Sequence, residues 1–409
     1  MSNLINVPLA SLALNSGAFV DGPFGSNLKA SEYVDDGIPV IRLQNIRPNR
    51  YDPNNLRFIT KRKAESLQRH NYQAGDVVIT KLGELCGVAC QIPKNAQSGI
   101  IVADVVRFRG DSSRIDHRYL VHFLNSQDGR CQVSQLTKGT TRQRVNLSDF
   151  KKIQIPLPTL EEQRRIAAIL DKADEVRRKR KQAIALTEEL LRSLFLDMFG
   201  DPVTNPKGWD KTTFGDLVPA KGEIVDGPFG SSLKPECYVN NGIRVIRNFN
   251  IHDDLFDQSS FVYVTEQKFV EIFRSNVIPG DLLLSTKGTI GDICVMPELQ
   301  GESVLSASGT VRIRLPGKSP LLAEFIVQQM VQASYKKYMK LFEAGTNQKY
   351  LNLSGIRKME LIVPPMQIQH NFVAVRENIN HLKIRQQIDY SESNNLFNSI
   401  LQKAFRGEL

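Results

Sequence analysis

Two polar loops carry side chains whose chemistry suits contact with nucleic-acid bases. Their candidate binding residues are Lys138, Thr140, Arg142, Gln143 and Arg144 in the first loop and Thr346, Asn347, Gln348, Lys349 and Tyr350 in the second. Arginine pairs with guanine, and asparagine or glutamine with adenine, at base edges in the major groove, whereas threonine and lysine suit phosphates. The alternative is a pair of ordinary polar loops in which Asn146 and Asn352 form local turns.

A second group of candidates flanks a turn that occurs twice. The sequence Asp-Gly-Pro-Phe-Gly-Ser spans residues 21–26 and again residues 226–231. Its glycines and proline predict a turn, and we expect Phe24 or Phe229 to anchor that turn on the core. The functional interpretation places four nearby side chains beside a phosphate backbone: Ser26, Lys29, Ser231 and Lys234.

A lysine beside a glycine ends a predicted buried strand in each half. Gly75-Asp76 leads to Lys81, and Gly280-Asp281 leads to Lys287. We expect each lysine to be either solvated or in contact with a phosphate. The sequence lacks the second acidic residue, spaced before the lysine, that a metal-dependent nuclease needs to hold its ion. Catalysis at this position is therefore not expected.

These candidates recur because the chain is duplicated from end to end. The motif that begins at Asp21 returns 205 residues later at Asp226, and the residues after it repeat in the same order. A period this long indicates two domain-sized units, since solenoid repeats span roughly 20 to 50 residues. In the first unit we expect strands at 38–46, 76–81 and 101–109 and a helix at 116–127. Their counterparts are strands at 243–251, 281–286 and 303–315 and a helix at 320–337.

A long amphipathic helix is predicted at the end of each half. Apolar residues recur in steps of three and four over 166–194 and again over 372–400, which is typical of a coiled-coil seam. Thr159 and Glu162 predict a capping box for the first helix, and a glycine follows each helix. We expect the two seams to pack antiparallel, forming a spacer of roughly 60 Å. The alternative is two separate helices, each lying on its own domain.

Five consecutive basic residues, 177–181, lie within the first long helix. Because consecutive helical residues point in all directions, we expect most of them to form a solvated face with Asp174 and Glu175 as partners. The alternative is DNA that passes alongside the helix.

Composition indicates a globular protein, and the absence of several motifs leads us to expect no catalytic chemistry of its own. The chain has 409 residues, is 41% hydrophobic and carries a net charge of +10, which is compatible with a polyanionic partner. The five scattered cysteines suggest reduced thiols, and we expect no metal site. Signal-peptide and membrane-spanning patterns are lacking, so we expect a cytoplasmic protein. Phosphate-binding and dinucleotide-binding glycine loops and the motif of amino-methylating enzymes are also lacking.

The ordered set of motifs resembles the specificity subunit of type I DNA restriction-modification enzymes. The resemblance covers almost the whole chain and rests on five segments: 21–29, Gly75-Asp76, 156–163, 190–202 and 401–409. It implies two target-recognition domains, each reading one half of a split DNA site, joined by two long helices. It also implies double-stranded DNA, two adenine-N6 methyltransferase subunits and motor-nuclease subunits as partners. S-adenosylmethionine, ATP and Mg²⁺ would then belong to those partners, with no cofactor in this chain.

The expected fold is therefore α+β, with two similar mixed domains and two antiparallel helices. We expect recognition domains at 1–157 and 201–363 and spacer helices at 158–200 and 364–409. At the second helix entrance only Gln369 matches its counterpart Gln163, which leaves open whether both ends hold partners equally. An antiparallel spacer predicts two different half-sites in opposite orientation, about 34 Å apart. The rival functions are a single-chain DNA-modifying enzyme and a protein-binding scaffold that does not contact DNA.

Overall fold

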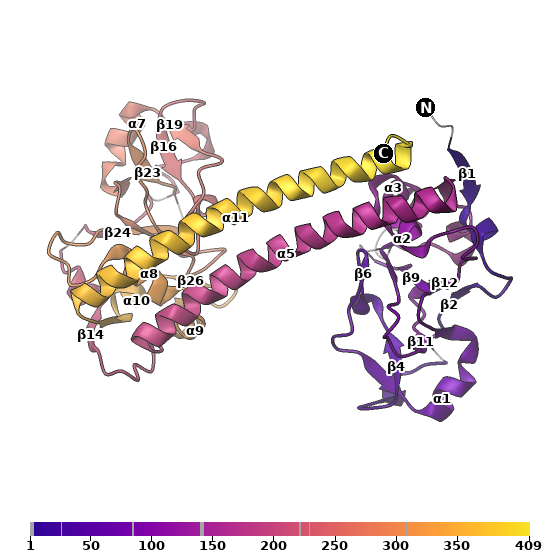
Figure 1. Ribbon diagram of the computed structural model, residues 1–409. Coiled ribbons are helices and arrows are strands. Elements are labelled where there is room, and N and C mark those ends of the chain that lie inside the picture. Colours follow the sequence, from indigo (N-terminus) through magenta and orange to yellow (C-terminus); the bar gives the residue numbers. More distant parts are fainter. Residues whose placement is uncertain are drawn as a thin grey trace. The chain divides into compact units, whose positions relative to one another are not determined.

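The computed structural model describes residues 4–25, 27–83, 86–139, 143–220, 222–228, 230–307 and 309–409. The chain divides into two compact units. The first unit contains Met1–Lys181 and Ile388–Leu409, and the second contains Gln182–Gln387. Each unit therefore includes one part of each long helix, α5 (Leu160–Phe199) and α11 (Met366–Arg406) (Figure 1).

The first unit is built on a four-stranded antiparallel sheet in the order β10-β9-β12-β2 and a five-stranded mixed sheet in the order β3-β7-β4-β11-β8. Its strands are β1 (Ile5–Pro8), β2 (Phe19–Asp21), β3 (Tyr33–Val34), β4 (Ile38–Ile41), β5 (Ile46–Arg47), β6 (Arg50–Tyr51), β7 (Arg57–Ile59), β8 (Asn71–Tyr72), β9 (Val77–Thr80), β10 (Ala89–Gln91), β11 (Gly99–Ile101), β12 (Val105–Phe108) and β13 (Gln154–Leu157). Its shorter helices are α1 (Lys61–Ser66), α2 (His117–Asn125), α3 (Gln127–Leu136) and α4 (Leu147–Phe150).

The second unit repeats this plan with four-stranded sheets in the orders β15-β24-β21-β22 and β19-β16-β23-β20. Its strands are β14 (Asp210–Thr213), β15 (Ile224–Asp226), β16 (Ile243–Ile246), β17 (Ile251–His252), β18 (Leu255–Phe256), β19 (Val262–Val264), β20 (Asn276–Val277), β21 (Leu282–Ser285), β22 (Ile293–Val295), β23 (Ser303–Leu305), β24 (Thr310–Ile313), β25 (Glu343–Ala344), β26 (Tyr350–Leu351) and β27 (Glu360–Val363). Its shorter helices are α6 (Phe214–Leu217), α7 (Glu266–Glu271), α8 (Ala323–Met330), α9 (Ala333–Met339) and α10 (Leu353–Arg357).

The strand expected at 38–46 is interrupted by the side chain of Asn45. Its Oδ1 accepts from the Arg42 N–H at 3.0 Å, and its Nδ2 donates to the Asp52 and Asn54 carbonyls at 3.0 Å. An asparagine that bonds local backbone in this way competes with the sheet ladder. β4 therefore ends at Ile41, and Asn250 repeats the arrangement with Arg247 in the second unit.

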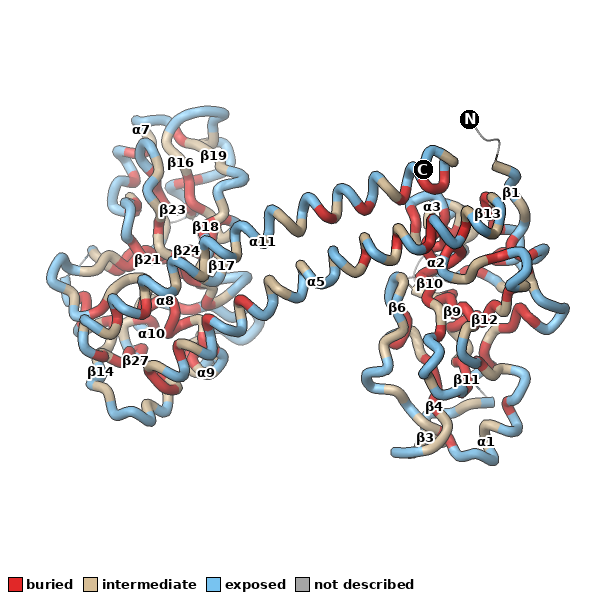
Figure 2. The backbone as a smooth tube through the Cα atoms, viewed as in Figure 1, coloured by how far each residue is buried: buried red, intermediate tan, exposed pale blue. Residues whose placement is uncertain are grey.

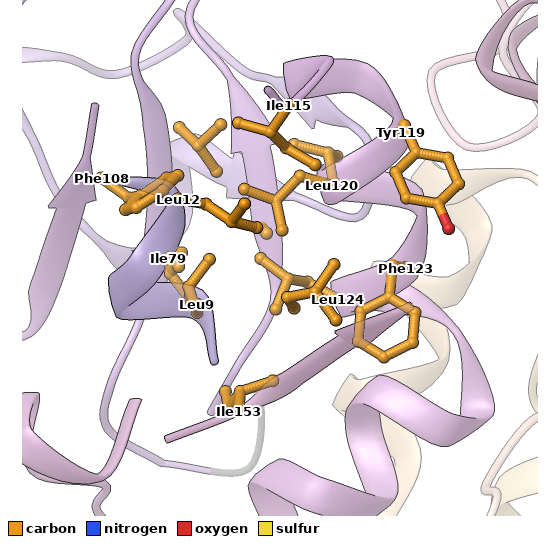
Figure 3. Close-up of a cluster of buried hydrophobic side chains, with 14 of the residues drawn as sticks. Leu9, Leu12, Ile79, Phe108, Ile115, Tyr119, Leu120, Phe123, Leu124 and Ile153 are labelled. Atoms are coloured by element: carbon orange, nitrogen blue, oxygen red, sulfur yellow. The ribbon is translucent and has the colours of Figure 1, made fainter. Parts of the chain in front are cut away.

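In each unit, the C-terminal end of one long helix packs into the core. In the first unit, Phe405 of α11 packs edge-on against Tyr119 and Phe123 of α2, with ring centroids 5.3 and 5.1 Å apart. Figure 3 shows Tyr119 and Phe123 within a cluster of buried hydrophobic side chains in the first unit. In the second unit, Phe195 of α5 lies 5.6 Å from Phe372 of α11. Figure 2 shows the resulting buried segments within the sheets and on the helix faces that pack against them.

The two long helices run antiparallel within each unit, as expected, and their seams face each other. In the first unit, the Arg180 guanidinium donates to the Asp389 carbonyl and the Ser393 hydroxyl. In the second unit, the Thr187 hydroxyl lies 3.0 Å from the Gln386 side-chain oxygen. The alternative in which each helix lies separately on its own domain is therefore wrong. These polar seam contacts give the helix pair a defined register.

Helix boundaries follow local chemistry. The Thr159 hydroxyl accepts from the Glu162 N–H at 3.3 Å, so half of the expected capping box forms, while the Glu162 carboxylate pairs with Arg165 instead. Both long helices end at glycines in the left-handed region, Gly200 at φ 77° and Gly407 at φ 72°. Among the described residues, no helix has both the length and the hydropathy needed to span a bilayer.

Candidate nucleic-acid interface

Each polar loop lies at the tip of a short antiparallel hairpin. In the first unit, Lys138 and Arg144 exchange backbone hydrogen bonds of 2.9 and 3.0 Å. In the second unit, β25 pairs with β26, so that Ala344 lies opposite Tyr350. These ladders hold both ends of each loop. The two predicted loops therefore occupy equivalent places in the two units.

The described side chains at these tips face solvent. They are Lys138, Gln143, Arg144, Thr346, Asn347, Gln348, Lys349 and Tyr350. Thr140 and Arg142 lie outside the described residues. Lys138 also approaches Asp149, at 3.4 Å. Hydrogen bonding to Lys152, and then to Lys138, lowers the pKa of that carboxyl group.

Three segments that are distant in sequence converge at each hairpin. In the first unit, the Gly83 N–H donates to the Gln143 carbonyl at 2.8 Å, and the Lys81 ammonium pairs with Asp21 at 2.7 Å. In the second unit, the Leu351 N–H donates to the Thr286 carbonyl at 3.0 Å. Asp226 of the duplicated turn, Lys287 after β21 and Tyr350 of the hairpin line one cavity in the second unit, so the same three segments meet in both units.

The expectation for Lys81 is corrected by the structure. Its side chain is only 2% exposed and is paired with Asp21, so it is not a projecting lysine that is free for phosphate contact. The residue of the second unit that corresponds to Lys81 is also not Lys287, the one expected. The Lys81 N–H donates to the Asp104 carbonyl, and the Thr286 N–H donates to the Gly309 carbonyl at the same place in the second unit. Thr286 is therefore the counterpart of Lys81.

Lys287 lies one residue further along and is exposed. Its ammonium lies 5.9 Å from the centroid of the Tyr350 ring, which is within the range of a cation–π contact. Because successive residues at a strand end point in opposite directions, a shift of one position separates a buried lysine from an exposed one. Lys287 remains a candidate DNA contact.

Several residues in and after the duplicated turn face solvent. Phe24 is 67% exposed, so the expectation that it anchors the loop is wrong. Lys29, Ser231 and Lys234 are also exposed. Ser26 and Phe229 lie outside the described residues.

The acidic residue that precedes β9 in the first unit and β21 in the second pairs with an arginine in both units. Asp76 accepts two hydrogen bonds from Arg109, at 2.7 and 2.8 Å, and Asp281 accepts two from Arg314, both at 2.8 Å. These hydrogen bonds raise the pKa of each arginine. Within the described part of the chain, no group of three His, Cys, Asp or Glu side chains could hold a metal ion.

Two buried glutamines at the helix entrances have a role that the sequence pattern did not predict. Gln163 accepts from the Asp116 N–H at 2.9 Å and donates to the Arg114 and Pro158 carbonyls at 3.0 Å. Gln369 accepts from the Leu322 N–H at 3.0 Å and donates to the Pro320 and Pro364 carbonyls at 2.9 and 2.8 Å. Both side chains therefore fix a long helix to its own unit. The two glutamines occupy corresponding positions in the repeat, and this correspondence is the sequence signal that could have identified them.

The basic run of α5 is largely engaged within the helices. Arg177 and Arg178 pair with Asp174 at 2.5 and 2.9 Å, and Lys179 pairs with Glu175 at 2.7 Å. These contacts confirm the expected acidic partners. Arg177 also covers the Phe397 ring of α11, with its guanidinium carbon 4.4 Å from the centroid. The run therefore contributes to helix pairing as well as to a solvated face.

Comparison with known proteins agrees with this architecture. The family described as type I restriction modification DNA specificity domain matches residues 25–186. The specificity subunit of the type I restriction enzyme StySPI from Salmonella potsdam is 23% identical over 402 residues, covering 92% of this chain and 83% of that protein.

Two solved structures share the fold. The S subunit of a type I restriction-modification system from M. genitalium has a TM-score of 0.57 at 16% identity, covering 99% of this chain and 97% of that one. A chain from a type I restriction-modification system, solved to explain its assembly and conformational transition, has a TM-score of 0.54 at 19% identity, covering 100% and 99%. With its duplicated units and paired long helices, the chain is similar along most of its length to type I restriction enzyme specificity subunits, and residues 25–186 match the specificity-domain family.

Proposed function

We propose that this chain selects the DNA sequence for a type I restriction-modification complex and leaves the chemistry to other subunits. The observation that carries this proposal is the convergence, once in each unit, of a duplicated turn, a strand end and an exposed polar hairpin tip. Such tips offer the hydrogen-bonding side chains that read base edges, held on a rigid sheet. Residues 1–157 and 201–363 are assigned to recognition.

The two half-sites differ in sequence under this proposal. The first tip presents Gln143 and Arg144, whereas the second presents Gln348, Lys349 and Tyr350. Different donors and acceptors select different bases. The remaining exposed residues, Lys29, Ser231, Lys234 and Lys287, suit contacts with phosphates, which position the protein without reading sequence. The expected target is bipartite and asymmetric, with unspecified bases between its halves.

The long helices, residues 158–200 and 364–409, are proposed to fix the number of unspecified base pairs. They also offer apolar surface for partners. In the first unit, a groove of about 660 Å³ is lined in part by Ile169, Val176 and Leu396. In the second unit, Leu186 and Ile384 are each more than half exposed. Apolar surface of this kind is typical of protein interfaces.

The partners proposed for these helices are two adenine-N6 methyltransferase subunits. Motor-nuclease subunits would join the same complex, in the cytoplasm. The methyltransferases would supply S-adenosylmethionine, and the motor-nuclease subunits would supply ATP and Mg²⁺.

Binding of the purified chain to duplex DNA tests the proposal against a scaffold that does not contact DNA. Phosphate contacts release counterions, so affinity should fall steeply and linearly on a log–log plot as salt rises. Binding that is absent, or that is indifferent to salt, would contradict DNA recognition. Methyl transfer by the purified chain alone would contradict its assignment as a subunit without catalytic chemistry.

A further inference from the structure

The second unit contains a cavity at the point where its three segments converge, and the first unit fills the equivalent place with a lysine. The cavity has a volume of about 340 Å³, and its lining includes Asp226, Thr286, Lys287, Thr310 and Tyr350. It is therefore bounded by an acid, two hydroxyls, a cation and an aromatic ring. The lining also contains the apolar residues Pro228, Ala307, Val311, Leu351 and Leu353, so it suits a planar group with a polar edge.

The two units differ at this place because one position holds a lysine in the first unit and a threonine in the second. In the first unit, the long side chain of Lys81 reaches Asp21 at 2.7 Å, and the lysine is almost completely buried. In the second unit, the counterpart of Lys81 is Thr286. The threonine side chain extends three heavy atoms less far from the backbone than a lysine side chain does. Among the described residues, the carboxylate of Asp226 has no ion pair or hydrogen bond, and Asp226 is exposed. The same acid is thus neutralised in one unit and available in the other.

A buried hydroxyl in the lining also lacks a partner. Thr310 is 1% exposed, and its Oγ1 makes no hydrogen bond within the described part of the chain. Buried polar groups are nearly always hydrogen-bonded, and leaving one unpaired is costly. A polar group or an ordered water brought into the cavity would satisfy this hydroxyl. The cavity therefore has the character of a binding site rather than a packing defect.

We propose that Asp226 accepts a hydrogen bond from the amino group of a cytosine in the second half-site. A carboxylate accepts from cytosine N4 in the major groove, whereas guanine and thymine present carbonyl oxygens that would repel it. Adenine offers an amino group but places its N7 acceptor beside it, which makes it a poorer match for a carboxylate. Tyr350 and Lys287 at the rim supply a ring face and a charge for the adjoining nucleotide. This inference rests on the proposed function.

The test measures base preference at every position of the second half-site. The full chain selects from duplexes in which that half-site is randomised, and the bound pool is sequenced. We expect the wild-type chain to require cytosine at one position and Asp226→Asn to lower that preference about tenfold, with the other positions unchanged. Thr286→Lys should do the same, because its ammonium would occupy the cavity and pair with Asp226 as Lys81 pairs with Asp21. Glu302→Gln, which removes an exposed carboxylate from the same unit, should leave every preference unchanged.

A second probe separates hydrogen bonding from folding. Replacing the selected cytosine by 2-pyrimidinone, which lacks the amino group, should weaken wild-type binding about tenfold and leave Asp226→Asn binding unchanged. Unaltered preferences in both variants, or a uniform loss of binding at all positions, would overturn the role of Asp226. A wild-type chain without any base preference would instead refute the proposed function itself.

Discussion

Gln369 offers a quantitative test of how the long helices are attached to their units. Its side chain is fully buried and makes three hydrogen bonds, to the Leu322 N–H and to the Pro320 and Pro364 carbonyls. Gln369→Met keeps the volume of the side chain and removes all three bonds. Each orphaned buried group costs about 1 to 3 kcal/mol. We therefore expect a loss of about 3 kcal/mol in the free energy of unfolding.

For a unit of about 200 residues, this loss corresponds to a fall in Tm of roughly 6 to 12 °C. The assay is thermal and urea unfolding of the full chain, followed by circular dichroism. Gln367→Met is the matched control, because Gln367 lies two residues away on the same helix and is exposed. A Gln369→Met variant within about 0.5 kcal/mol of the control would refute the role of the buried amide.

Three further outcomes follow from the proposed function. Gln348→Ala should relax base selection in one half-site only, measured by selection from randomised duplexes, whereas a uniform loss would assign Gln348 to phosphate. Lys349→Ala should weaken binding equally for all sequences and reduce the salt slope by about one, with an unchanged slope counting against a phosphate contact. Inserting four helical residues after both Lys181 and Gln387 lengthens the helix pair by about 6 Å. This should change the number of unspecified base pairs in methylation mapping, and an unchanged number would remove the helices as the spacing device.

The duplication and the paired helices were predictable because their signals are periodic. The seam residues recur in steps of three and four, and glycines mark both helix ends, so the extent of α5 and α11 follows from the sequence. The contribution of Phe405 to the core of the first unit could not be read in this way. It depends on contacts between residues far apart in the chain, which periodicity does not encode.

The candidate site was only partly predictable, because exposure at a strand end changes with every residue. Matching Lys81 to Lys287 required a shift of one position, and the backbone hydrogen bonds instead pair Lys81 with Thr286. Phe24 is large and apolar, which favours burial, yet the turn places it in solvent. The glutamines at the helix entrances were visible as coincidences, but their role required the positions of the backbone groups that they bind.

Methylome sequencing of a host strain with and without this gene, in the presence of its methyltransferase partner, tests DNA selection by this chain most directly. We predict N6-methyladenine at one motif that depends on the gene. That motif should be bipartite, with two different specified halves separated by a fixed number of unspecified base pairs. A continuous or palindromic motif, or a methylome that does not change when the gene is removed, would contradict the account.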